Sequence, residues 1–249
     1  MNRNRFEKIL AVAAAVLLWQ LAAVAIGEEV LLVSPLKVVL RLSELIFEAE
    51  FWGTILFSFK RITLGFFIAL AAGTALAILS YRFRIVEIFL WPYISIIKAT
   101  PVASFVILCL IWLSSSQLPI FIAFLMAVPI IYTNMLGGFK STDRKLLEMA
   151  EIFRFSFGKR LLYIYFPQVK SHFVSACSVS LGLSWKAGIA AEIIGIPDGS
   201  MGEMLYQAKL YLATADLFSW TVTIILVSVL FEKAVMCVIN ILFSTMEGL

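Results

Sequence analysis

The chain has 249 residues, of which 62% are hydrophobic and only 14% are charged, and its formal net charge is +4. Soluble domains carry about 25% charged residues, so this composition cannot cover a soluble surface and predicts a protein whose solvent is the lipid bilayer. In such an apolar chain a basic excess indicates contact with anionic lipid, and we expect no nucleic-acid partner.

Six apolar segments predict membrane spans. A spanning helix needs about 20 mostly apolar residues, and the candidates are 6–26, 55–80, 85–113, 118–136, 173–196 and 217–243. The third is interrupted at Pro92 and Pro101. We therefore predict an all-α membrane protein with about six transmembrane helices. The first segment also has the basic start and small residues of a signal peptide, but its long apolar run favours an uncleaved helix.

The three cysteines, Cys109, Cys177 and Cys237, each stand alone inside an apolar stretch without CxxC spacing. This pattern indicates neither a zinc site nor a redox pair. We expect them to be small buried apolar residues.

Basic residues are distributed unequally between the predicted loops. With the N-terminus inside, twelve fall on the inner side and three on the outer side. The inner set is Arg3, Arg5, Lys8, Arg82, Arg84, Lys140, Arg144, Lys145, Arg154, Lys159, Arg160 and Lys170; the outer set is Lys37, Arg41 and Lys209. Because basic residues accumulate on the cytoplasmic side, we expect both termini to be cytoplasmic.

The longest cytoplasmic connection, residues 137–171, predicts two short helices before the fifth span. Asp143 ends a cluster typical of helix N-caps, Ser156 is placed to cap a second helix, and Pro167 fits the first turn of the span. An apolar flank follows Asp143 at helical spacing, made of Leu146, Leu147, Ala150 and Phe153. From the residues alone, this segment is either an amphipathic linker at the membrane surface or a docking surface for another protein.

The same segment resembles the EAA loop of binding-protein-dependent importer permeases. In that pattern Glu-Ala-Ala is followed by three residues, Gly, nine residues, Ile, one residue and Leu-Pro. The matching positions are Glu148, Ala150, Ile164 and Pro167, and the differing ones are Met149, Arg154 and Phe166. Arg154 replaces the glycine, so it must either avoid a positive φ or adopt one at a cost. Gly158 offers a second place for the turn.

Other landmarks extend the resemblance over nearly the whole chain, most closely to the nitrate, sulfonate and taurine branch. They are Ser34-Pro35, Arg61 with Leu64-Gly65-Phe66, Lys98-Ala99-Thr100-Pro101, Ala191-Glu192-Ile193-Ile194-Gly195 and Gly199-Ser200-Met201-Gly202. The resemblance implies a type I ABC importer permease fold in a single transmembrane domain, residues 1–249, with a cytoplasmic coupling helix in 137–171. It also implies a multi-pass location in the bacterial inner membrane.

The resemblance implies a permease that is not an enzyme and holds no cofactor or metal, since ATP is bound by a partner ATPase subunit. The chain has no phosphate-binding loop of the Gly-x-x-x-x-Gly-Lys-[Ser/Thr] type. Further implied partners are a periplasmic or lipid-anchored substrate-binding protein and a second permease copy, in a homodimer or a heterodimer. The ATPase-coupling residues that follow from the motif are Asp143, Leu147, Glu148, Ala150, Arg154 and Pro167.

Ionisable residues inside the spans are the candidates for the translocation path, because a charge in lipid costs about 2.5–3.5 kcal/mol on insertion scales. Glu192 shares a helix face with Gly188 and Gly195, Lys98 precedes the break at Pro101, and Lys186 lies on a different face of the fifth span. A structural ion pair is the alternative for Glu192. Arg61, Gly65, Ala69 and Gly73 form a small-residue packing stripe.

The sequence alone leaves two other functions as alternatives. A stand-alone secondary transporter commonly shows inverted repeats, and none is visible here. An intramembrane enzyme needs a nucleophile–base pair or metal ligands, and the chain has one histidine. For the substrate, the branch resemblance suggests a small anion, either sulfonate, taurine or nitrate-like, with a vitamin-precursor-like molecule as the alternative.

Overall fold

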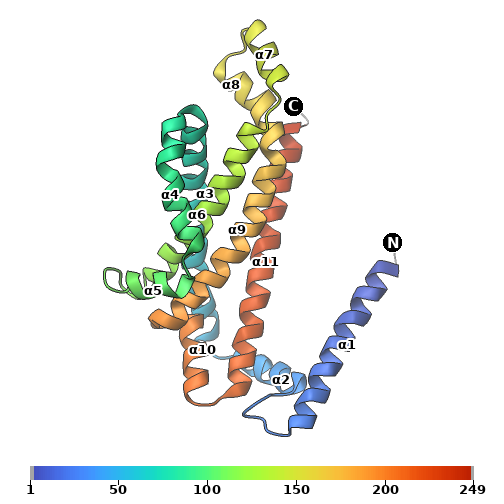
Figure 1. The fold of residues 1–249 in the computed structure, drawn as a ribbon. Coiled ribbons are helices and arrows are strands. Elements are labelled where there is room, and N and C mark those ends of the chain that lie inside the picture. Colours follow the sequence, from blue (N-terminus) through green and yellow to red (C-terminus); the bar gives the residue numbers. More distant parts are fainter. Residues whose placement is uncertain (1–2, 248–249) are drawn as a thin grey trace.

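The computed structural model describes residues 3–247, and every regular element in that range is helical. The helices are α1 (Arg3–Ile26), α2 (Pro35–Leu45), α3 (Phe51–Arg82), α4 (Arg84–Ala99), α5 (Val102–Cys109), α6 (Leu118–Lys140), α7 (Arg144–Ile152), α8 (Phe157–Arg160), η1 (Leu161–Tyr165), α9 (Phe166–Gly195), α10 (Met201–Leu210) and α11 (Thr214–Glu247). Figure 1 shows α3, α6, α9 and α11 side by side along one axis, with α7 and α8 at one end and α2 at the other.

Five helices are long and apolar enough to cross a membrane, and a sixth span results if α4 and α5 count as one. The two parts of that pair are bent by 103°. The break lies at Thr100 and Pro101, where α4 ends and α5 begins. The expected second interruption at Pro92 is wrong, because Pro92 lies inside α4 and the helix continues through it. A proline removes one hydrogen bond of a helix, and transmembrane helices tolerate that loss where neighbouring groups compensate.

The central helix α6 packs against α3 on one side and α9 on the other. Small residues make the α3–α6 contact close: a Cβ built on Gly65 would lie 2.3 Å from the carbonyl oxygen of Ile120, and one on Gly73 would lie 2.9 Å from Ile131. Gly65, Ala69 and Gly73 are buried along this contact. The predicted small-residue stripe is therefore the α3–α6 interface.

Two short helices, α2 and α10, appear where the sequence predicted only loops. In α2, Ser34 caps the N-terminus by accepting from the Lys37 amide, and Pro35 occupies the first turn. The Arg41 side chain then ties α2 to α11 through Asp216, and it also pairs with Glu44 at 3.0 Å. The hydrogen bond to Asp216 is the main reason that the pKa of the Arg41 guanidinium is raised above its ordinary value.

The three cysteines differ in environment. Cys109 and Cys177 are buried as expected, whereas Cys237 on α11 is exposed. The expectation that all three are buried is wrong for Cys237, because α11 presents much of its surface outward: only 17% of its most apolar window is buried inside the chain.

Candidate functional site

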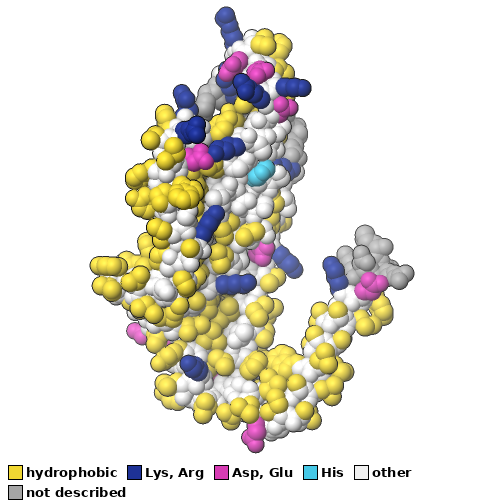
Figure 2. Space-filling view, in the orientation of Figure 1, with side chains coloured by type: hydrophobic (Ala, Val, Ile, Leu, Met, Phe, Trp, Pro, Cys, Tyr) yellow, Lys and Arg dark blue, Asp and Glu magenta, His cyan; other side chains and the backbone are white. Residues whose placement is uncertain are grey.

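The segment between α6 and α9 forms a small platform, residues 141–165, at one end of the bundle (Figure 1). Asp143 caps α7 as predicted, because its side chain accepts a hydrogen bond from the Lys145 amide at 2.9 Å. Arg160 holds the two short helices together, since its Nε donates to the Phe155 carbonyl at 3.2 Å and its guanidinium lies 3.7 Å from Glu151. Figure 2 shows basic side chains gathered over this end of the molecule.

The turn that ends α7 is built on Arg154, which has a φ of 51°. The Arg154 amide donates to Glu151 and the Phe155 amide to Ala150, at 3.0 and 2.8 Å. This is the Schellman pairing that usually closes a helix with glycine in the left-handed position. Gly158 is not among the residues with positive φ. The arginine therefore keeps the turn where the resembled pattern has glycine, and Gly158 does not relocate it.

The structure corrects the predicted apolar flank of α7. Ala150 is completely buried within the chain, and Leu146 and Leu147 are half-buried. Of the predicted flank only Phe153 is exposed, and Met149 and Ile152 complete the apolar surface that α7 leaves uncovered. Ile152 and Phe153 are 78% and 67% exposed. Ala150 and the two leucines thus form the covered flank of α7, and the other flank is free to meet a partner.

Glu148 lies beside that exposed flank. Its carboxylate is 3.3 Å from the Nε of Arg144, one turn earlier, with the two side chains 60% and 91% exposed. Such an exposed pair within one helix stabilises it by only about 0.3–0.5 kcal/mol, so Glu148 can exchange Arg144 for another cation at little cost. Pro167 is exposed in the first turn of α9, directly after the π-helical turn η1, as predicted for helix entry.

Glu192 is fully enclosed at the far end of α9. The Ser58 hydroxyl donates to Glu192 Oε2 at 2.8 Å and itself accepts from the Met201 amide at 2.9 Å. The Gly202 amide also donates to Oε2, at 3.1 Å. One carboxylate thus joins α3, α9 and the start of α10, where the partial positive charge of the helix N-terminus favours it. The Glu192 side chain is not exposed on this chain, and among the described residues its other oxygen, Oε1, has no hydrogen-bond partner.

The two predicted path lysines lie apart from Glu192. Lys98 is exposed in the last turn of α4, and its Nζ lies 3.5 Å from the Thr133 hydroxyl on α6. It therefore stands at the bend between α4 and α5, beside the broken span. Lys186 is exposed on α9 and lines a cavity of about 450 Å³ with α10 and α11. Among the residues that the structure describes, no group of three or more His, Cys, Asp or Glu is arranged to hold a metal ion.

Arg61 is the site residue whose contacts the sequence did not indicate. Its Nε donates to the Ser116 carbonyl at 2.8 Å, and its guanidinium lies 3.4 Å from the centre of the Phe57 ring. Arg61 therefore anchors the connection between α5 and α6 onto α3. The only available signal was its position at the head of the small-residue stripe, and nothing in the stripe reveals a partner 55 positions away.

Most of the chain matches the sequence model of one protein family. Residues 62–247 match the model for binding-protein-dependent transport system inner membrane components. The protein named aliphatic sulfonates transport permease protein SsuC in Bacillus subtilis is 25% identical over 223 residues, which cover 88% of this chain and 80% of that one. The bicarbonate transport system permease protein CmpB of Synechococcus elongatus is 27% identical, covering 74% and 66%. The taurine transport system permease protein TauC of Escherichia coli is 24% identical, covering 74% and 67%.

Proposed function

Since the chain belongs to the family of binding-protein-dependent transport system inner membrane components, we propose that it is the permease subunit of an ATP-binding-cassette importer. In this role the chain forms the translocation path. It also transmits the conformational changes of a separate ATPase to that path. The observation that carries the proposal is the platform: a capped nine-residue helix, α7, set beyond the end of the bundle with an apolar flank exposed. A partner subunit binds ATP, and this chain does no catalysis.

The ATPase contact is proposed to be a helix in a groove. Met149, Ile152 and Phe153 would fill an apolar groove of the ATPase, as in other complexes in which an amphipathic helix docks by one face. Glu148, on the edge of this flank, would leave Arg144 and pair with a basic residue of the groove. Because Arg160 joins α7 to α8 through Glu151 and Phe155, and α8 continues through η1 into α9, a push on the flank would be transmitted to α9.

The proposed substrate is a small anion. The relatives named above include permeases for aliphatic sulfonates and for bicarbonate, both of which are anions. Lys98, exposed beside the break between α4 and α5, supplies a positive charge where the freed backbone of a broken span can line a cavity. A substrate-binding protein would deliver the anion on the α2 side, and two copies of the chain would enclose the path in the bacterial inner membrane.

The coupling proposal is tested with Glu148→Arg in the full transporter, reconstituted with its ATPase and binding protein. Removing one partner of a desolvated interfacial charge pair costs roughly 2–5 kcal/mol, so we expect substrate-stimulated ATP hydrolysis to fall to the basal rate. The matched control is Arg144→Gln, which breaks the pair within α7 but keeps the carboxylate, and should retain stimulation. Native mass spectrometry checks that each variant still inserts and that the assembly holds two copies of this chain.

Two results contradict the assignment. Wild-type transport by an assembled Glu148→Arg complex would remove the coupling role of Glu148. Equal loss of stimulation in Arg144→Gln would show that the ion pair within α7 matters, rather than a contact with the ATPase.

A further inference from the structure

A second polar site lies at the platform end of the bundle, away from α7. It is a cavity of about 640 Å³ between the end of α3, the start of α4 and the end of α6. The residues that line it are Ser80, Tyr81, Arg84, Glu87, Ile88, Trp91 and Lys140. None of them belongs to the platform or to the candidate path residues.

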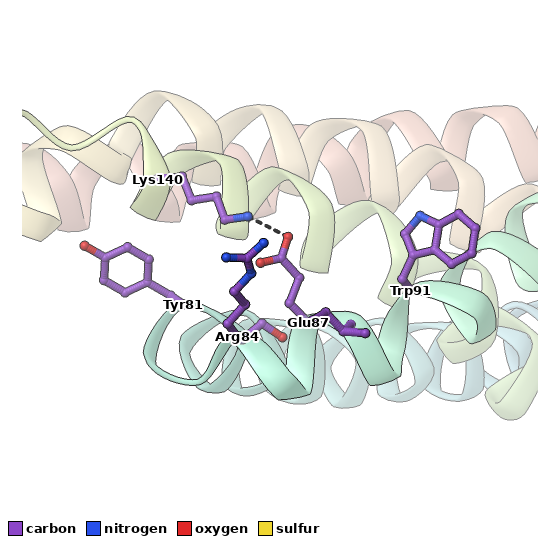
Figure 3. Close-up of a pocket in the computed structure, with 7 residues that line it drawn as sticks. Tyr81, Arg84, Glu87, Trp91 and Lys140 are labelled. Atoms are coloured by element: carbon purple, nitrogen blue, oxygen red, sulfur yellow. Dashed lines mark hydrogen bonds and ion pairs between the residues drawn. The ribbon is translucent and has the colours of Figure 1, made fainter.

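The charges in this cavity leave one cation without a counter-ion. Lys140 forms an ion pair with Glu87 at 2.5 Å. Figure 3 shows the Arg84 guanidinium pointing toward this pair from the first turn of α4. Within the described part of the chain, the Arg84 side chain forms no hydrogen bond or ion pair. The mouth of the cavity therefore holds two cations and one carboxylate. The Arg84 guanidinium is free to bind an anion with two parallel hydrogen bonds.

The cavity changes from polar to apolar along α4. Arg84 and Lys140 lie at the ends of their helices, where a spanning helix meets the headgroup region. Trp91 lies seven positions beyond Arg84, which is about 10 Å deeper along the helix axis, and Ile88 lies between them. Trp91 and Ile88, which both line the cavity, are 71% and 59% exposed. This face of α4 thus continues the cavity as an apolar surface suited to a hydrocarbon chain.

We propose that this cavity is a binding site for the phosphate headgroup of an anionic phospholipid, with an acyl chain lying along α4 past Ile88 and Trp91. A phosphate-bearing anion is the chemistry that Arg84 and Lys140 recognise. The apolar continuation favours a lipid over free phosphate, because a soluble anion gains nothing from Trp91. Basic pockets between transmembrane helices are known to bind anionic headgroups, and in the proposed orientation this is the cytoplasmic leaflet. The inference does not depend on the transport function.

Glu87 makes the site testable in both directions. In the free protein Glu87 neutralises Lys140, and it would repel an incoming phosphate. Removing the Arg84 charge should weaken lipid binding, whereas Glu87→Gln should strengthen it by releasing Lys140. A basic residue near an anionic lipid surface contributes about 1 kcal/mol, so each change should alter the apparent affinity about fivefold, in opposite directions.

The experiment is native mass spectrometry of the full-length chain in detergent, titrated with phosphatidylglycerol or with phosphatidylcholine. We expect selective retention of phosphatidylglycerol, about fivefold weaker in Arg84→Gln and about fivefold stronger in Glu87→Gln. The matched control is Arg82→Gln, which removes the same charge two positions away. Arg82 lies against the Phe83 ring, 5.5 Å from its centre, and does not line the cavity. This variant should retain the lipid as the wild type does.

Each other outcome overturns the proposal. Equal loss in Arg82→Gln and Arg84→Gln would show general surface attraction, and equal retention of both lipids would show no headgroup selectivity. Glycerol 3-phosphate or inorganic phosphate displacing the lipid at the same concentration would assign the cavity to a soluble anion. If Arg84→Gln fails to fold, Glu87→Gln decides alone: unchanged or weaker lipid retention in that variant rules out the site.

Discussion

Arg154 holds a backbone conformation that a side chain makes costly. A left-handed residue other than glycine is less stable by roughly 1–2 kcal/mol, yet the Schellman hydrogen bonds to Glu151 and Ala150 are both present. The turn is therefore imposed by its surroundings: Ala150 is buried and Arg160 binds both Phe155 and Glu151. The strain lies in the one turn that separates the proposed docking helix from the helix that leads into α9.

We predict that Arg154→Gly relieves this strain and protects the end of α7. Backbone amides of residues 153–155 should exchange with deuterium more slowly than in the wild type, by about fivefold for roughly 1 kcal/mol. Arg154→Val should exchange faster, because a β-branched residue suits a positive φ least. Gly158→Ala is the control, since its Cβ would meet nothing within 4 Å. Faster exchange in Arg154→Gly would show that the arginine side chain itself holds the turn.

At the scale of elements, the long helices were predictable and the short ones were not. A membrane span can be recognised from a run of about 20 apolar residues. The five long helices begin and end within a few residues of the predicted segments, except that α9 starts earlier. In contrast, α2 and α10 are 11 and 10 residues long and carry no such signal. Their positions depend on contacts distant in sequence: Arg41 with Asp216, and Ser58 with Met201.

The same limit applies to the candidate site. The motif spacing located α7 and its cap, because Asp143 and the residues after it act locally. It could not tell which flank of α7 is buried, since helical spacing alone does not show which face of a helix the rest of the chain covers. Glu192 was recognised as an ionisable residue on a glycine face, but its partners Ser58 and Met201 come from other helices. An ion pair was the expected alternative, and hydrogen bonds were found instead.

The closeness of α3 and α6 gives a prediction about packing. A Cβ at Gly65 would lie 2.3 Å from a backbone oxygen and 2.9 Å from Ala123, neither of which can move away freely. Gly65→Ala should therefore lower the melting temperature of the purified chain, since overpacking costs typically 1–3 kcal/mol. Gly53→Ala, on the same helix with nothing within 4 Å, should leave it unchanged or raise it, because alanine is the better helix former. Equal melting temperatures for the two variants would contradict the close α3–α6 contact.

At the scale of the whole molecule, the all-α architecture with five or six candidate spans confirms the predicted fold class. The first span stands apart from the rest: its most apolar window is only 6% buried within the chain. It touches the others near its C-terminal end, where the Trp19 indole donates to the Val33 carbonyl at 3.0 Å and its ring lies 5.5 Å from that of Phe218. The hydropathy of α1 predicted that it is a membrane span. Composition carries no information about where this helix packs.

The two ends of the molecule differ in charge, and this difference predicts its orientation in the membrane. The platform end carries most of the basic loop residues, whereas the α2 end carries an acidic cluster in which Arg41 contacts Glu44, Glu48 and Asp216. From the positive-inside rule, we predict that the platform faces the cytoplasm. The test is cysteine labelling in intact cells, in a background where Cys109, Cys177 and Cys237 are replaced. Glu28→Cys lies in the exposed turn between α1 and α2, and Lys159→Cys lies on the exposed surface of α8.

A membrane-impermeant maleimide should label Glu28→Cys in intact cells and Lys159→Cys only after the membrane is opened. The two cysteines control for each other, because both are exposed on the folded chain and differ only in the side on which they lie. Labelling of both in intact cells would place the platform outside or show a leaky membrane, and a protected cytoplasmic marker protein separates these cases. Labelling of Lys159→Cys alone would invert the topology. It would also place α7 on the side where no ATP is available, and the coupling proposal would fail with it.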